Sequence, residues 1–301
     1  MTQNPGKYIN PFTDFGFKKL FGTAFNKILL IDFLNQVLGG KEKIEDLTYL
    51  NNEALGKTKT DRSAIFDLYC ENEKGEKFIV ELQNVKQEYF IDRSIFYSTF
   101  PIQSQAPKGK GWDYQLKAVY TIGLLNFSFP GTDSQERYLR EVMLMDKHSH
   151  EIFYEKLTFI YLEIPKFNKG EEELENRFDK WLYVLKNLSE FQERPAKLQE
   201  KIFEKLFEEA EIAKLNQEEM KNYDESLKVY RDNQNTLAYA IKESMKEGMQ
   251  QGMEQGREEG RKEGRQEEKM EIAKMLKKNG VSIELIAKST GLTQEQIEGL
   301  I

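Results

Sequence analysis

The sequence IFDLYCENEKGEKFIVELQ occupies residues 65–83 and reads as two β-strands joined by a tight turn. Its middle, Asn72–Gly75, has the composition of a hairpin loop, and the run after it is rich in strand-forming residues. Because side chains alternate between the faces of a strand, Glu81 and Gln83 point to the same side. Regular antiparallel pairing then brings Asp67 opposite them. The stretch therefore predicts two carboxylates that converge on one sheet surface.

Two converging carboxylates are costly unless a cation, a proton or hydrogen-bond donors neutralise them. Mg²⁺ accepts such oxygens, usually from one or two carboxylates with several waters retained. A metal held in this way can activate water for phosphodiester hydrolysis. The alternative is that Asp67 and Glu81 are ordinary acidic residues on an exposed hairpin face, a pattern that also arises by chance. Spacing alone leaves both interpretations open.

Capping residues and apolar periodicity predict the elements around this hairpin. Thr13 and Asp14 can cap a helix that runs to about Gly22, and a second helix is expected over 24–38. Strands are expected over 44–53, 64–71, 78–84, 116–126, 137–145 and 157–164, with a helix over 88–105. This order closes a first domain near Pro165.

Four motifs in this order resemble the PD-(D/E)XK nuclease superfamily, and more closely its bacterial recombination-promoting nuclease and transposase family. They are NPFTDFGFKKLFG at 10–22, Asp67 with ELQ at 81–83, DRSIFY at 92–97, and the strand at 116–127. The resemblance implies an α/β, restriction-endonuclease-like core of helix, three-strand meander, helix and strand. An all-helical C-terminal extension would follow it.

The resemblance also implies roles for individual residues. Asp67 and Glu81 would be the metal-binding acids, and Leu82 would add a backbone carbonyl. Asp14 is then either a third acid near the metal or simply the helix N-cap. Gln83 stands where most of the superfamily has lysine, and a glutamine can only orient water or phosphate by hydrogen bonds. The cofactor would be Mg²⁺, with Mn²⁺ as an alternative.

Basic residues flank the hairpin, although the net charge of −7 argues against nonspecific coating of nucleic acid. Arg93 and Tyr97 share one face of the helix expected over 88–105, where they can contact phosphate and stack near a base. Alternatively, Tyr97 packs in the core and Arg93 pairs with an acid. The other candidate contacts are Lys57, Lys59, Arg62, Lys86, Lys108 and Lys110.

The remainder of the chain predicts helices. Amphipathic patterns predict helices over 171–188 and 197–215. We expect them to form a helical subdomain (166–235) after the nuclease-like domain (1–165). A long arm (236–278) carries glycines at every fourth position from Gly248 to Gly264, beside a row of Leu237, Ile241, Met245, Met249 and Met253. We expect it to associate as a homodimer or higher homo-oligomer; the alternative is a solvated spacer. A cap (279–301) resembles a helix-turn-helix, but its acidic 294–298 segment favours packing over DNA reading.

Other sequence features bear on the cellular location of the protein and on the roles of its cysteine and histidines. We expect a cytoplasmic protein without membrane association, since no signal-peptide or membrane-length apolar run occurs. Cys70, the only cysteine, is interpreted as a small core residue, and His148 and His150 as surface residues. We therefore expect a metal-dependent DNA endonuclease of low sequence specificity, which the resemblance links to recombination or transposition. The alternative is a catalytically degenerate dimeric scaffold that binds DNA or protein.

Overall fold

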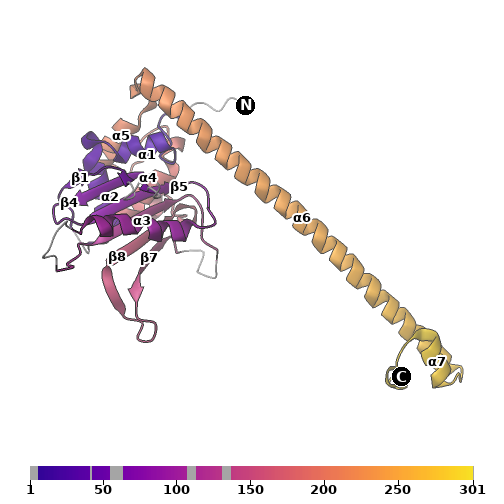
Figure 1. The fold of residues 1–301 in the computed structure, drawn as a ribbon. Coiled ribbons are helices and arrows are strands. Elements are labelled where there is room, and N and C mark those ends of the chain that lie inside the picture. Colours follow the sequence, from indigo (N-terminus) through magenta and orange to yellow (C-terminus); the bar gives the residue numbers. More distant parts are fainter. Residues whose placement is uncertain (1–5, 41–42, 55–63, 107–112, 131–136, 301) are drawn as a thin grey trace. The chain divides into compact units, whose positions relative to one another are not determined.

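A six-stranded mixed sheet lies at the centre of the first of two units, residues 1–234, in the computed structural model (Figure 1). The structure describes residues 6–40, 43–54, 64–106, 113–130 and 137–300. The strand order is β1-β4-β5-β6-β8-β7. The strands are β1 (Leu47–Tyr49), β4 (Leu68–Asn72), β5 (Lys77–Gln83), β6 (Val119–Leu125), β7 (Leu139–Met145) and β8 (Ile152–Glu163).

The first three strands of this sheet form the expected antiparallel meander, in which β4 lies between β1 and β5. The next two neighbours, β6 and β8, run parallel to β5 and to each other, and β7 closes the far edge antiparallel to β8. The central strands are apolar on both faces because helices cover both sides. These features confirm the expected α/β fold class.

Helices α1 (Asp14–Phe21), α2 (Lys27–Val37), α4 (Arg177–Asn187) and α5 (Lys201–Ala210) share one core with one face of the sheet. That face presents alternate residues such as Cys70, Phe78 and Val80. Trp181 of α4 is fully buried there and packs against rings of α1, α2 and α5. The helices after residue 166 thus contribute to the same core as the sheet.

Helix α3 (Phe90–Ser104) lies against the opposite face of the sheet. Phe90 packs with Phe127 and Tyr161, while Tyr97 packs with Phe66 and the apolar residues near Ile79. Because Asp67, Glu81 and Gln83 alternate with residues of the other face, they point toward the α3 side.

Two bends divide strands that the sequence predicts as continuous. The expected strands over 44–53 and 64–71 become β1 with β2 (Glu53–Ala54) and β3 (Ala64–Ile65) with β4. The bends lie at Asn52 and Asp67, where the Asn52 side-chain amide donates to the Asp67 carbonyl at 2.9 Å. Asp67 therefore precedes β4 rather than lying inside it.

The β7–β8 hairpin differs from expectation in length. Strand β8 begins at Ile152, five residues before the predicted start, and pairs with the end of β7 through a bulge. The turn between them contains His148 and His150, which are exposed as expected. Cys70 is fully buried, in agreement with its interpretation as a core residue.

The second unit comprises residues 235–301. Most of it is the later part of α6 (Gln217–Lys278), so the helix of the predicted arm begins well before residue 236. A Cβ added at any glycine from Gly248 to Gly264 would meet nothing within 4 Å, and Met245, Met249 and Met253 are about two-thirds exposed, at 72%, 69% and 67%.

Two short helices, α7 (Ile283–Thr290) and α8 (Gln294–Glu298), pack against the C-terminal turns of α6. Thr293 and Gln296 form the expected capping box. The Lys277 ammonium donates to the carbonyls of Ile297, Glu298 and Leu300 at 3.1, 3.0 and 2.8 Å, which ties the chain end to α6. None of the helices in the described residues has the length and apolar character needed to cross a membrane.

Candidate functional site

The hairpin brings Asp67 and Glu81 into direct contact through the backbone. The β4–β5 register pairs Leu68 with Val80, so the next pair outward is Asp67 and Glu81. The Asp67 N–H donates to Glu81 Oε1 at 3.3 Å, and the Leu82 N–H donates to Asp67 Oδ2 at 2.7 Å. The bend before β4 thus directs the Asp67 carboxylate across the hairpin toward β5.

Both carboxyl groups are held away from water. Glu81 is 8% exposed and Asp67 is half-buried. Burial, with the neighbouring Asp67 charge as a further cause, raises the pKa of Glu81 to about 8. Burial also raises the pKa of Asp67, against the opposing effect of the Leu82 N–H. The pair therefore carries unfavourable negative charge that a cation would neutralise.

Gln83 lies between Glu81 and α3. Its Nε2 donates to Glu81 Oε2 at 3.3 Å, and its Oε1 accepts from Arg93 Nη2 at 2.6 Å. Arg93 also bonds the Gln87 side chain, and its guanidinium lies 5.8 Å from the ring centroid of Tyr97. Arg93 thus contacts glutamines in this structure, and Tyr97 is half-buried beside it.

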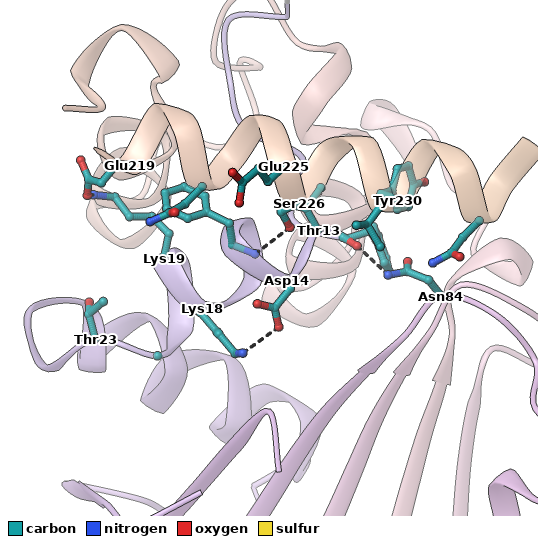
Figure 2. A pocket seen from close by; sticks show the side chains of 16 residues that line it. Thr13, Asp14, Lys18, Lys19, Thr23, Asn84, Glu219, Glu225, Ser226 and Tyr230 are labelled. Carbon is teal, nitrogen blue, oxygen red and sulfur yellow. Dashed lines mark hydrogen bonds and ion pairs between the residues drawn. The ribbon is translucent and has the colours of Figure 1, made fainter. Parts of the chain in front are cut away.

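The start of α1 lies close enough to Asp67 for its charges to act on that carboxylate. The helix N-cap is Thr13, whose Oγ1 accepts from the Gly16 N–H at 3.0 Å, so the N-cap interpretation of Asp14 is wrong. Thr13 takes this position because its side chain reaches back over the first turn, while Asp14 is already helical. Asp14 is exposed and pairs with Lys18 at 2.7 Å (Figure 2). Lys18 lowers the pKa of Asp67 and Asp14 raises it, so both charges act on Asp67.

A cleft of about 700 Å³ opens beside this site, between α1 and the first turns of α6 (Figure 2). Asp14 and Lys18 line it together with Asn84, the residue that follows Gln83. Asn84 Nδ2 donates to the Phe12 carbonyl at 2.7 Å, which joins the end of β5 to the start of α1. Ser226 and Tyr230 of α6 also line the cleft, and nothing in their local sequence indicated this position.

The donor set of the pair fits one hard divalent cation. A buried and a half-buried carboxylate, both with raised pKa values, offer oxygen ligands, and such a cation completes its coordination with water. Among the residues that the structure describes, no group of three or more His, Cys, Asp or Glu side chains could hold a metal. Asp67 and Glu81 are the two acidic groups that the site offers to such a cation.

Of the other predicted nucleic-acid contacts, Lys86 alone lies in the part of the chain that the structure describes. Lys86 is exposed in the segment between β5 and α3. Lys57, Lys59, Arg62, Lys108 and Lys110 lie outside the described residues.

A family model described as PD-(D/E)XK nuclease family transposase matches residues 11–240, well over half of the chain. The match confirms the resemblance expected from the N-terminal motif and the hairpin, and it covers the sheet, its helices and the site. No curated protein and no solved structure matches the chain at a significant level.

Proposed function

The chain belongs to the PD-(D/E)XK nuclease family of transposases, and we propose that it is a metal-dependent DNA endonuclease. The observation that carries the proposal is the convergence of Asp67 and Glu81, two largely covered carboxylates with raised pKa values at the end of one hairpin. Perturbed acids beside a cleft are typical of functional sites. We assign Mg²⁺ as the metal, with Mn²⁺ as an alternative.

Each residue of the site has a distinct task in this proposal. Asp67 and Glu81 would hold the metal, and the Leu82 carbonyl would complete the protein ligands. When bound, the metal would neutralise charge and activate water. The Leu82 N–H fixes one Asp67 oxygen, which leaves the other available. Gln83 would orient water or phosphate through its amide.

Substrate DNA would approach from the side of α1. Lys18 and Lys19 line the cleft; Lys19 pairs with Glu219 at 2.5 Å, whereas Lys18 acts on Asp67, with Asp14 as a third acidic group near it. Arg93, Tyr97, Lys59 and Arg62 stay proposed nucleic-acid contacts. We propose low sequence specificity, because α8 of the helix-turn-helix-like segment reads QEQIE and lacks the basic donors that base reading needs. The family description supports a role in recombination or transposition.

The exposed row on α6 supports self-association into a homodimer or higher homo-oligomer. Met245, Met249 and Met253 remain largely uncovered, and the adjacent glycines would let a second helix approach closely. The second candidate function is a catalytically degenerate scaffold that binds DNA or protein. It is favoured because position 83 holds a glutamine instead of a lysine.

Cleavage of supercoiled plasmid separates the two functions. Wild type, Asp67→Ala and Glu81→Ala are compared with Mg²⁺ and with Mn²⁺. Glu155→Ala, an exposed acid on β8, serves as the matched control. We expect nicking or linearisation by wild type and the control, and none by the two site variants. Intact plasmid with every protein and both metals would favour the scaffold.

A further inference from the structure

We infer that Arg93 is a positioning residue, which fixes the Gln83 amide and brings a permanent positive charge to the acid pair through it. The inference rests on the proposed nuclease function and deepens it. It also changes the expected role of Arg93, from a DNA contact to a part of the site itself.

The hydrogen bonds on the two ends of Gln83 determine how its amide is turned. An arginine has only donors, so it must face the amide oxygen, and the distance from Nη2 to Oε1 is 2.6 Å. An ionised Glu81 has only acceptors, so it must face the amide nitrogen, and Nε2 lies 3.3 Å from Oε2. Both ends therefore demand the same orientation. Without Arg93, only the longer bond to Glu81 would hold the amide in this orientation, and the amide oxygen would lose its charged donor.

Arg93 is itself held in place from two directions. The Gln87 side chain accepts from its Nη1, and its guanidinium lies 5.7 Å from the Phe90 ring centroid and 5.8 Å from that of Tyr97. Helix α3 provides the arginine and both rings, and Phe90 and Tyr97 pack against the sheet face that presents Glu81. A guanidinium supported in this way is pre-organised for its hydrogen bonds.

The positive charge of Arg93 matters because, among the residues that the structure describes, no cationic side chain donates a hydrogen bond to Glu81 directly. The carboxylate accepts from the Asp67 N–H and from Gln83, which are both neutral donors. A hydrogen bond from a charged donor polarises the amide in between and strengthens the bond that the amide donates. Arg93 therefore supplies through Gln83 the positive charge that a lysine at position 83 would supply directly.

A charge-relocation experiment tests this role. Wild type, Arg93→Gln, Gln83→Lys and the double variant Arg93→Gln/Gln83→Lys are assayed on a labelled DNA duplex with Mg²⁺. We expect Arg93→Gln to lower kcat by roughly 10- to 100-fold with KM nearly unchanged, as for loss of a group that positions the site. Adding Gln83→Lys should recover at least about tenfold of this loss, because the new ammonium carries the charge. Arg137→Gln, at an exposed arginine before β7, is the control and should match wild type.

Two outcomes would overturn the inference. A rise in KM at unchanged kcat would make Arg93 a phosphate contact, and a double variant no better than Arg93→Gln would remove the charge role. If Arg93→Gln fails to fold, Arg93→Lys and Arg93→Met replace it, and the lysine variant must be the more active.

A second measurement does not depend on activity. The urea midpoints of Arg93→Ala, Gln83→Ala and the double alanine variant form a double-mutant cycle. We expect the double variant to shift the midpoint by less than the sum of the single shifts. Additive shifts would show that the contact contributes nothing and would overturn the inference, even in a protein that cuts no DNA. Inactive wild type with a non-additive cycle would instead refute only the proposed nuclease function.

Discussion

Replacing Glu81 by glutamine should make the metal-free protein more stable at neutral pH. Glu81→Gln keeps the size of the side chain and an oxygen that can accept from the Asp67 N–H. The substitution removes the Glu81 carboxyl group, whose ionisation is opposed by burial and by the charge of Asp67. A site that binds a cation is strained without it, so loss of the charge should relieve the strain.

The size of this stability difference follows from the pKa of Glu81, which burial and the Asp67 charge raise from 4.5 to about 8 in the folded protein. Because the folded pKa is the higher one, the folded protein holds this proton more tightly than the unfolded chain. Its stabilising effect is complete below pH 4.5 and is lost as the pH rises through about 8. At about 1.4 kcal/mol per pKa unit, the loss between pH 4.5 and pH 7 amounts to about 3 kcal/mol. This is an upper value, since Asp67 shares the titration.

Urea unfolding in EDTA measures this loss, with tryptophan fluorescence as the signal, to which the fully buried Trp181 of the first unit contributes. Wild type should lose stability relative to Glu81→Gln at each step through pH 5, 6, 7 and 8. Adding Mg²⁺ should reduce the difference in unfolding free energy between wild type and Glu81→Gln, because the metal would stabilise only the protein with both acids. Glu155→Gln, the exposed control, should follow wild type. Parallel pH curves for wild type and Glu81→Gln would refute the reasoning.

Three further predictions concern other parts of the molecule. Thr13→Ala removes the N-cap bond to Gly16 and should lower the free energy of unfolding by about 1 kcal/mol, which urea titration measures; Thr13→Ser should keep most of it. Burial raises the pKa of the Cys70 thiol to about 12, so a thiol reagent at pH 8 should label the native protein slowly and the urea-unfolded protein at once. Replacing Gly252 and Gly256 by leucine should block close helix approach and lower the sedimenting mass, whereas a solvated spacer would sediment unchanged.

The sequence predicted the core of the fold because that information is local. The hairpin of β4 and β5 follows from strand-forming residues around an Asn72–Gly75 turn, and Gly75 adopts the positive φ of +81° that such turns require. The alternation of side chains was enough to expect Asp67 and Glu81 on one face. The family match then confirmed the resemblance carried by these residues.

The features that the sequence did not predict depend on tertiary contacts. At the division before β4, the Asn52 amide, 15 residues away, bonds the Asp67 carbonyl, and nothing in the residues next to Asp67 indicated that bend. The early start of β8 at Ile152 was hidden because Glu155 and Lys156 interrupt the apolar pattern in an exposed hairpin. The bond between Arg93 and Gln83 requires α3 to cross the sheet, which a helical face alone does not specify.

The close spacing of the site along the chain has a consequence for how the protein acquires it. Asp67 and Glu81 are 14 residues apart, and Gln83 and Arg93 are 10 apart. Closing loops this short costs little chain entropy, so contacts of this kind can form early in folding. Of the strands that flank the hairpin, β6 is recruited from farther along the chain, since Lys77 pairs with Val119. The two acids can therefore meet before the helices bury them, and a divalent cation supplied during refolding should speed the later step in which burial makes their charges unfavourable.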